Sequence, residues 1–412
     1  MYDSIRGTKD ILPEESKKWE FLERTIREVA RLYNVQEIRI PTFERTELFY
    51  KSTGEDTDIV QKEMYTFTDK GGRSLTLKPE GTPGVVRAFL QYSLHKKRPF
   101  HKLFYIERMF RQERPQKGRY REFYQFGVEI IGSASPLVDV ELISMVMNIL
   151  ERLGIKGTYV RVNSLGCDKC RADYRKALKE YLKGKLPLLC ENCRRRYETN
   201  PLRILDCKVD AEKLTDAPRM IDFLCDECKE HHRIVIDTLK SLNIPFKEDP
   251  TLVRGLDYYT RTVFEFIHPS LGAQDSIGGG GRYDTLIKSM GGPDIPAAGF
   301  AMGMERMLLA MGDREIEEEK PVVFFVALGD DAKRLSFNLL EGMRKAGVKA
   351  DMDYIGRSMK AQMREANRLG AMFTYIIGED EIKKGIGILK NMGTGEQMNV
   401  PMDVEEIKRR IS

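Results

Sequence analysis

The sequence lacks the apolar segments that export signals and membrane spans require. It contains no run of about 18 apolar residues. Its amino end, MYDSIRGTKDILPEESKK, has charged residues where a signal peptide would have an apolar core. We therefore expect a soluble, cytoplasmic protein that has no membrane partner.

Several common catalytic motifs are missing as well. The sequence contains no GxxxxGK[ST] phosphate loop, no HExxH zinc-protease motif and no GxSxG nucleophile elbow. Its five histidines lie in unrelated polar contexts and do not suggest a catalytic triad. The remaining candidates for catalysis are carboxylates, arginines and a bound phosphate. That set suits electrostatic stabilisation of a transition state better than nucleophilic attack by the protein.

An excess of one charge is also absent. The 68 lysines and arginines nearly balance the 63 aspartates and glutamates, which leaves a net charge of +5. This excess is too small to demonstrate nucleic-acid binding, although it permits a local basic face. A length of 412 residues favours more than one domain.

The hydrophobic pattern changes at residue 321. Before it, a helical pattern over 14–33 is followed by strand-like runs joined by short polar turns or helices. This pattern predicts an α+β domain over 1–320, with a mixed, largely antiparallel sheet flanked by helices. From 321 to 412 strands and helices alternate, which predicts a separate α/β domain behind the acidic linker EIEEEK. We interpret residues from about 167 to 245, which hold all seven cysteines, as a helical insertion.

An arginine-rich turn joins two of the predicted strands. Arginine presents planar, paired donors that suit phosphate oxygens, whereas the alternative for such a segment is a solvated charged hairpin. The basic residues of the turn are Arg111, Arg114, Lys117, Arg119 and Arg121. In the second strand, alternation puts Phe123, Gln125, Gly127 and Glu129 on one face. That face suits a small polar ligand.

Two glycine-containing segments follow later in the chain. AAGFAMGMERMLLAM predicts a strand that passes through Gly303 into a helix with Arg306 in its first turn, where a phosphate would be favoured. In SIGGGGRYD, Tyr283 stands where a dinucleotide fingerprint would have its last glycine. We therefore predict that the glycines of this segment allow a ligand or another backbone to approach closely.

Together these segments resemble the signature motifs of class II aminoacyl-tRNA synthetases. EIRIPTFE, with Pro41, resembles the dimer-interface motif, FRQE to GVE the second motif, and GFAMGMER the third. LVRGLDYYTRTVFEF and SIGGGGRYD resemble the two stretches that distinguish histidyl-tRNA synthetases from their relatives. The resemblance extends from RGTKDILP to the carboxy-terminal α/β domain, which is similar to the anticodon-binding domain of that family.

The resemblance implies a role for each site residue. Histidine would be bound by Glu80, Gly81, Thr82, Arg111, Gln125, Glu129, Arg254, Tyr258 and Tyr259. ATP would be bound by Arg111, Glu113, Arg119, Phe123 and Arg306. Arg254 and Arg111 would be catalytic, and Glu129 with the two tyrosines would surround the imidazole. The implied substrates are L-histidine, ATP with Mg²⁺, and tRNA(His), and the implied assembly is a homodimer.

The cysteines form CxxC pairs whose spacing resembles that of zinc knuckles. The pairs are Cys167/Cys170, Cys190/Cys193 and Cys225/Cys228, with Cys207 between the last two. A structural metal, free thiols and disulfides all remain open, because the family does not generally need a metal here. We assign no metal ligand from the sequence.

Two other functions compete with a ligase. The regulatory subunit of ATP phosphoribosyltransferase shares the catalytic fold but senses histidine, and it usually lacks the carboxy-terminal domain and the ATP-binding arginines. A synthetase for proline or threonine is the other alternative, and RGLDYY with Glu129 speaks against it. ATP–pyrophosphate exchange with each amino acid distinguishes the three.

Overall fold

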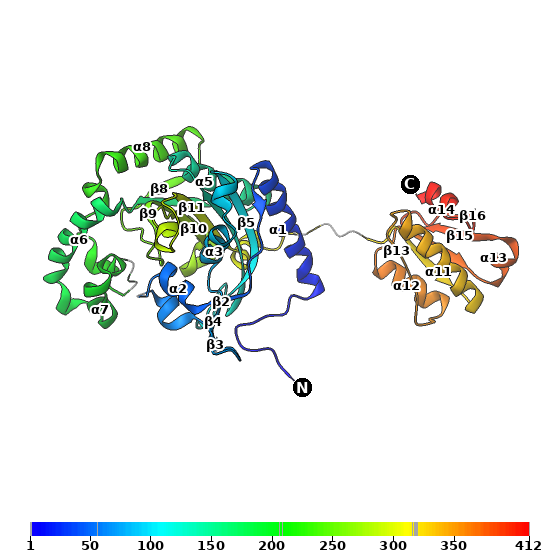
Figure 1. Ribbon diagram of the computed structural model, residues 1–412. Helices are drawn as coiled ribbons and strands as arrows, with labels where there is room; N and C mark the ends of the chain where they lie inside the picture. The colour runs from blue at the N-terminus through cyan, green and yellow to red at the C-terminus, as the bar shows by residue number, and fades with distance from the viewer. Residues whose placement is uncertain are drawn as a thin grey trace. The chain divides into compact units, whose positions relative to one another are not determined.

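The computed structural model describes residues 2–55, 57–205, 207, 209–314, 316 and 320–411. Its contacts divide the chain into two units, Met1–Ile316 and Glu317–Ser412 (Figure 1). The division falls inside the acidic stretch at 315–320. Each unit has its own hydrophobic core, so we describe the two separately.

An eight-stranded sheet forms the centre of the first unit. In spatial order its strands are β1 (Gln36–Glu37), β5 (His101–Phe110), β6 (Glu122–Ile131), β11 (Ala297–Gly303), β10 (Ser276–Arg282), β9 (Thr260–Ile267), β7 (Tyr159–Ser164) and β8 (Phe246–Glu248). The six inner strands run antiparallel, and only the edge strands β1 and β8 pair in parallel. This confirms the predicted mixed, largely antiparallel sheet. In EIRIPTFE, where the alternation of Ile38 and Ile40 before Pro41 predicts a strand, only Glu37 belongs to β1.

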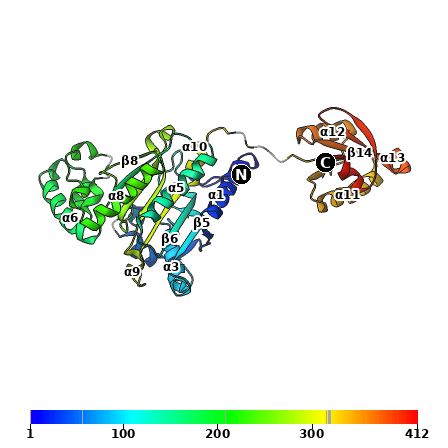
Figure 2. The same cartoon turned by 90° about the horizontal axis from the view of Figure 1, so that it is seen from above.

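Helices α1 (Pro13–Leu32), α5 (Pro136–Arg152) and α8 (Asp226–Ser241) form one layer along this sheet (Figures 1 and 2). The reason is visible in β6, where Phe126, Val128 and Ile130 enter the same core as the apolar faces of the three helices. Alternate residues of β6 must therefore face the opposite side of the sheet. The main core thus fixes which side chains the strand presents to a ligand.

Smaller elements surround the opposite side of the sheet. A three-stranded antiparallel sheet lies beside short helices that follow the dimer-interface motif. These strands are β2 (Phe43–Arg45), β4 (Ser74–Leu77) and β3 (Thr66–Thr68), and the helices are α2 (Thr46–Thr53), α3 (Thr82–Gln91), α4 (Leu94–Lys97) and α9 (Leu286–Ser289). The helix predicted after Gly303 is α10 (Met304–Met311), which packs in the main core and carries Arg306 in its first turn.

The cysteine-containing segment is helical, as predicted. It consists of α6 (Asp168–Lys183), α7 (Glu191–Thr199), several 3₁₀ turns and α8. Its own small core contains Tyr174, Leu178 and Ile204 together with buried cysteines. The end of α8, which lies inside the predicted insertion, packs in the main core through Val235 and Leu239. Helix α8 therefore belongs to the insertion at its start and to the catalytic unit at its end.

The second unit is built around a mixed five-stranded sheet, which confirms the predicted α/β domain. Its strands, in spatial order, are β13 (Ala350–Met352), β12 (Val323–Ala327), β14 (Phe373–Ile377), β15 (Ile386–Asn391) and β16 (Gln397–Pro401). Its helices are α11 (Asp330–Lys345), α12 (Met359–Arg368), α13 (Glu379–Lys384) and α14 (Val404–Ile411). Alternate residues of β12 enter two different cores, one formed with α11 and α14 and the other with α12. A strand buried on both faces reads as a continuous apolar run, as VVFFVA does.

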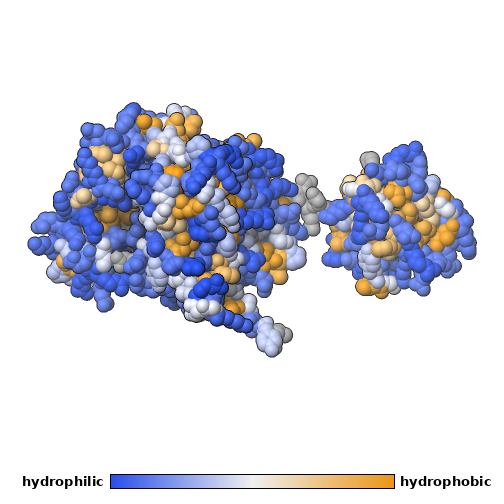
Figure 3. All heavy atoms as spheres, in the orientation of Figure 1, coloured by the Kyte–Doolittle hydropathy of each residue, from blue (hydrophilic) through white to orange (hydrophobic). Residues whose placement is uncertain are grey.

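Mostly hydrophilic side chains cover the face shown in Figure 3, in keeping with a composition that is 32% charged. Within the described ranges, we find no helix that is both long and apolar enough to cross a lipid bilayer.

Candidate active site

A cavity of about 460 Å³ opens on the side of the large sheet opposite the helical layer. Strands β5, β6, β9, β10 and β11 contribute to its walls, together with the segment before β9. The predicted residues that line it are Glu80, Gly81, Thr82, Arg111, Glu113, Arg119, Phe123, Gln125, Arg254, Tyr258, Tyr259 and Arg306. Segments far apart in the sequence therefore meet in one cavity. Glu129 alone among the predicted residues is not part of the cavity lining.

Buried carboxyl groups and hydroxyl groups form one end of the cavity, which we call the closed end. Glu80 accepts hydrogen bonds from the hydroxyl of Thr53 at 2.6 Å and from that of Tyr258 at 2.8 Å. Burial raises the pKa of Glu80, and these two donors oppose the rise. Because these groups are buried, each polar partner of a ligand has a large effect.

Glu129 lies directly behind this end of the cavity and is completely buried. Its carboxyl group accepts from the hydroxyl of Thr82 at 2.6 Å and from the hydroxyl of Tyr283, and both of these residues line the cavity. Burial raises the pKa of Glu129 to about 8. The carboxyl group is therefore mostly protonated at neutral pH, and a basic ligand nitrogen would be a suitable partner for its proton.

Two glycines create the space that these side chains occupy. Gly299 pairs with Glu129 across β11 and β6, and a Cβ atom there would lie 1.9 Å from Oε2 of Glu129. A Cβ atom on Gly81 would lie 2.3 Å from the Tyr105 ring. Larger residues at either position would displace the carboxyl group or the ring, so these glycines preserve the shape of the closed end.

Gln125 supplies an acceptor that the protein itself does not use. Its Oε1 atom is buried, yet no hydrogen-bond donor reaches it from the described residues. A buried polar atom normally has a hydrogen-bond partner, and Gln125 lines the cavity. Its Oε1 atom therefore suits a ligand that donates a hydrogen bond, such as an ammonium group. Thus Gln125 and Glu80 together suit the α-amino group of an amino acid.

Arginines dominate the other end, which we call the phosphate end. The Arg111 guanidinium lies over the Phe123 ring at 5.3 Å from its centroid and donates through Nε to the Pro79 carbonyl at 2.9 Å. Nearby, Arg119 pairs with Glu113 at 3.2 Å. These contacts hold the guanidinium groups in fixed directions, which favours binding of a phosphate chain.

Arg306 extends the cationic cluster from the start of α10. Its guanidinium donates to the carbonyls of Gly118 at 3.1 Å and Ser276 at 2.5 Å, so two neighbouring segments position it. Burial lowers its pKa, and the nearby Arg119 and Arg111 lower it further. Arginine nonetheless remains charged at neutral pH. The repulsion among these cations would be relieved by a polyanion.

Arg254 approaches the phosphate end from the opposite wall. It donates to Glu265 at 2.5 Å, and Ser276 donates to the same carboxylate at 2.7 Å. Burial favours a higher pKa for Glu265, but Arg254, Ser276 and Arg161 outweigh it and hold that pKa below its ordinary value. Glu265 therefore stays ionised and fixes the orientation of Arg254. A Cβ atom on Gly279 would lie 3.0 Å from Cζ of Arg254, so the glycine strand β10 leaves room for this arginine.

The sequence analysis missed four residues that support the site: Thr53, Tyr105, Tyr283 and Glu265. Tyr283 was noticed only because it departs from a dinucleotide fingerprint. Glu265 carried a usable signal, because it is a carboxylate inside the otherwise apolar strand VFEFI. Thr53 and Tyr105 reach the closed end only through the register of distant elements.

A largely antiparallel sheet that carries fixed arginines at one end of a cavity and an amino-acid site at the other defines a class II aminoacyl-tRNA synthetase. Comparisons with known proteins narrow this class. A family model described as histidyl-tRNA synthetase matches residues 7–307, and one described as an anticodon binding domain matches residues 309–412.

Full-length relatives agree with the family models. A histidine–tRNA ligase of Thermosipho melanesiensis is 50% identical over 406 residues, which cover 98% of this chain and 97% of that protein. A histidine–tRNA ligase of Thermotoga petrophila is 49% identical over 416 residues, covering 100% of this chain and 99% of that protein. The solved apo structure of S. aureus histidyl-tRNA synthetase is 42% identical, with a TM-score of 0.85 and 99% coverage of both chains. The chain belongs to the histidyl-tRNA synthetase family.

Proposed function

We propose that the cavity performs the histidine–tRNA ligase activity of the family, with histidine at the closed end and ATP at the phosphate end. The observation that carries this proposal is that one cavity contains both a buried carboxyl–tyrosine site and a cluster of fixed arginines. A protein that only sensed histidine would need the first of these and not the second.

At the closed end, Glu80, Thr82 and Gln125 bind the α-amino group, and Gly81 keeps the floor of the site open. Glu129, Tyr258 and Tyr259 bind the imidazole. The pairing suits imidazole because its two nitrogens need one donor and one acceptor. Tyr283 takes part by fixing Glu129. An amino acid without a ring nitrogen would leave the buried Glu129 carboxyl without its ligand partner, which is costly.

At the phosphate end, Phe123 stacks on adenine, while Glu113 and Arg119 contact ATP. Arg306 binds the outer phosphates, and Arg111 contacts both the histidine carboxylate and the α-phosphate. Arg254 faces the α-phosphate from the other wall. Two preorganised guanidinium groups then flank the phosphorus atom at which charge develops.

The reaction has two steps. A carboxylate oxygen of histidine attacks the α-phosphorus of ATP, and the bond from that phosphorus to the bridging oxygen breaks, so pyrophosphate leaves. The terminal 3′ hydroxyl of tRNA(His) then attacks the carbonyl carbon of the adenylate, loses its proton, and AMP leaves. Arg111 and Arg254 stabilise the first transition state more than its ground state, which is the condition for a faster reaction.

Mg²⁺ is expected to accompany ATP. Oxygen ligands suit this ion, and Glu113, Glu265 and Asp275 are among the carboxylates that line the cavity. When bound, the ion neutralises charge on the departing phosphates.

A homodimer formed through the Pro41 segment is the second part of the proposal. The apolar side chains of Phe43, Phe67 and Tyr92 are exposed on the elements around this segment, and Phe43 packs against Phe67. Exposed apolar residues that are close together are typical of a protein interface. Light scattering at micromolar concentration should give the mass of a dimer. The mass of a single chain would contradict this part.

The carboxy-terminal unit is proposed to bind the anticodon of tRNA(His), as the matching family model suggests. We place the reaction in the cytoplasm, where the family generally acts. The second unit is not proposed to take part in catalysis, because its two hydrophobic cores contain no residue of the cavity.

ATP–pyrophosphate exchange with each of the amino acids in turn tests the proposal. Histidine alone should support exchange, and the protein should then charge tRNA(His). Binding of histidine without exchange would favour the regulatory subunit of ATP phosphoribosyltransferase instead. Exchange with proline or threonine would contradict the assignment of the closed end.

A further inference from the structure

We propose that the insertion binds two structural zinc ions. One would be held by Cys167, Cys170, Cys225 and Cys228, which we call the base site. The other would be held by Cys190, Cys193, Cys207 and Asp210, which we call the tip site. In each set the four ligand atoms lie within 4.8 Å of one another, and together the sets use all seven cysteines of the chain.

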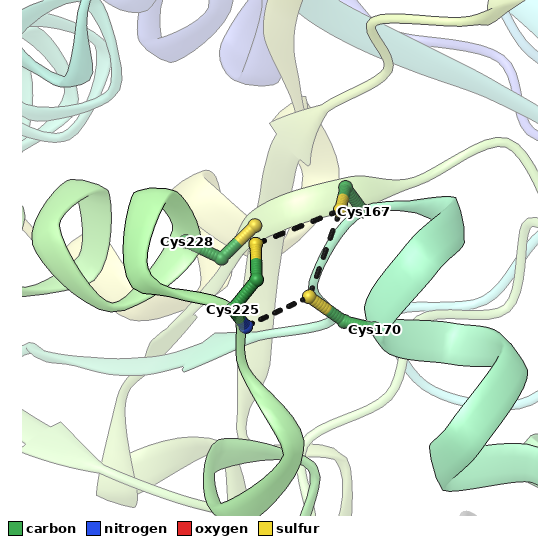
Figure 4. Close-up of side chains that lie close together, drawn as sticks. All are labelled: Cys167, Cys170, Cys225 and Cys228. Atoms are coloured by element: carbon green, nitrogen blue, oxygen red, sulfur yellow. Dashed lines mark hydrogen bonds between the residues drawn. The ribbon is translucent and has the colours of Figure 1, made fainter.

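The sulfur atoms of the base site are spaced as a tetrahedral metal requires. Four thiolates at a zinc–sulfur distance of about 2.3 Å have sulfur–sulfur distances of about 3.8 Å. The Sγ atom of Cys167 is 3.6 Å from that of Cys170 and 3.9 Å from that of Cys225. Figure 4 shows the four side chains turned toward one another from the starts of α6 and α8. All the cysteines are free, and the sulfurs gather as a group of four instead of two bonded pairs.

The backbone around the base site also suits thiolates. Cys167 and Cys225 stand immediately before the first residues of α6 and α8, and Cys170 and Cys228 lie in the first turns. Helix starts have unpaired N–H groups and a positive dipole end, both of which stabilise anionic sulfur. In addition, the Cys225 backbone N–H donates to Sγ of Cys170 at 3.1 Å. Such hydrogen bonds orient the ligands of a metal.

A different cluster supports the tip site. The Sγ atoms of Cys190 and Cys207 are 3.8 Å apart, and Sγ of Cys207 is 3.7 Å from Oδ2 of Asp210. Asp210 is completely buried, and Lys213 holds its other oxygen, Oδ1, at 2.7 Å. A buried carboxylate with one oxygen fixed by a lysine and the other among thiols has the arrangement of a zinc ligand with a supporting partner.

The positions of the two sites in the chain indicate that the metals would stabilise the insertion. The base site joins the point where the chain leaves β7 to the point where it enters α8. The tip site closes the loop that holds α7 and the following 3₁₀ turn. The core of the insertion is small and is partly made of the cysteines themselves. Small units with little apolar burial commonly depend on a metal for stability. Zinc is the metal that fits closed tetrahedral sets of four sulfurs or three sulfurs and one oxygen.

The loop closed by the tip site also touches the catalytic wall. Arg203 donates to the Gly255 carbonyl at 3.0 Å, and Asn200 donates to Asp257 at 2.8 Å. Gly255 follows Arg254 directly in the sequence, and Asp257 lies three residues after it. Loss of the tip metal should therefore disturb adenylate formation as well as the stability of the insertion.

Metal analysis of the full-length protein, purified without chelators, tests the proposal. Plasma mass spectrometry should find two zinc ions per chain, and a mercurial reagent that titrates the thiols should release both. X-ray absorption at the zinc edge should give about 2.3 Å for zinc–sulfur, with seven sulfur ligands and one oxygen for the two ions. A zinc-free protein, or iron in place of zinc, would overturn the proposal.

Variants assign the ions to the sites. Cys225→Ser with Cys228→Ser should remove one ion, and Asp210→Asn should weaken the other. Asp210→Cys should keep both ions and change the absorption spectrum of the cobalt-substituted protein toward four sulfurs. The matched control is Lys169→Ser, an exposed change between two ligands of the base site that should keep both ions. If the native protein held only one ion, the site whose variant loses that ion would be supported, and the proposal of the other site would be overturned.

If the cysteine variants do not fold, the metal content of the native chain and of Asp210→Cys still tests the proposal.

Discussion

The two ends of the cavity differ in how they prepare charge for a ligand. At the closed end, Glu80 and Glu129 are buried, and burial raises the pKa of each. At the phosphate end, ion pairs keep Glu113 and Glu265 beside arginines that stay cationic. One end thus relies on buried carboxyl groups that hydroxyl donors hold in place, and the other on fixed full charges.

This difference suggests that selectivity and rate are separated in space. A buried polar pair discriminates strongly because a ligand without the matching group leaves a partner unsatisfied. Fixed guanidinium groups act mainly on charge that develops during the reaction. We therefore expect substitutions at the closed end to affect the use of histidine. Substitutions at the phosphate end should affect the rate at saturation.

The largest effect is expected for Glu129→Gln. The amide nitrogen of glutamine cannot accept a hydrogen bond, so one of the two bonds that the carboxyl oxygens accept from Thr82 and Tyr283 is lost. We therefore expect kcat/KM for histidine to fall by up to about 10⁴, while the KM for ATP changes little. Steady-state pyrophosphate exchange measures both constants. Glu151→Gln, an exposed change on α5, is the control. Unchanged histidine kinetics would mean that Glu129 is only structural.

Arg254→Ala tests the phosphate end of the cavity. Removing one preorganised donor lowers a rate by about 10²–10³, and we expect at least that loss in single-turnover adenylate formation at saturating histidine and ATP. Arg254→Lys should restore little, because an ammonium cannot reproduce the planar fork. Arg31→Ala, an exposed arginine on α1, should react normally. A folded Arg254→Ala protein with a near-normal rate would remove this arginine from the catalytic residues.

Truncation after Ile316 should leave both ends of the cavity intact. The large core and the cavity belong entirely to the first unit, so the shortened chain should still exchange pyrophosphate. Charging of tRNA should fall at least about fivefold in kcat/KM, since even one lost base contact costs about 1–3 kcal/mol. The comparison of exchange with charging in one folded preparation is the measurement. Full charging by the truncated chain would contradict the anticodon-binding assignment.

A pH dependence of stability is also expected. Glu129 has its pKa raised to about 8 from an ordinary value of 4.5. Between these values the folded chain keeps a proton that the unfolded chain has lost, so stability falls as pH rises through this window. Glutamine does not titrate, and the Tm of wild type should therefore fall relative to that of Glu129→Gln from pH 5 to pH 8. Scanning calorimetry measures the difference. A Tm difference that is constant with pH would argue against a buried, protonated carboxyl group.

The sequence predicted the parts of the site that depend on local pattern. Alternation in β6 correctly separated Phe123, Gln125 and Glu129 from the core residues between them, because a strand presents alternate side chains to opposite faces. Together with the family resemblance, it also predicted that arginines of the β5–β6 turn and of the start of α10 share a site, and Arg111, Arg119 and Arg306 line the same cavity. These inferences needed no knowledge of how distant strands pair.

What was missed depends on register between distant segments. Tyr283 reaches Glu129 only because β10 and β6 both border β11, and Glu129 withdraws behind the cavity wall only because Gly299 is its neighbour across the sheet. The cysteines were left unassigned for the same reason. Spacing within each CxxC pair is local, whereas the meeting of Cys167 with Cys225 depends on where α6 and α8 begin.

A crystal structure with a non-hydrolysable histidyl-adenylate analogue tests the separation of the two ends most directly. We predict the imidazole at the closed end, within hydrogen-bonding distance of Glu129 or Tyr258, and the adenine against Phe123. The phosphate mimic should lie between Arg111 and Arg254. An analogue bound with its imidazole among the arginines, or with its phosphate mimic out of reach of both Arg111 and Arg254, would contradict this account.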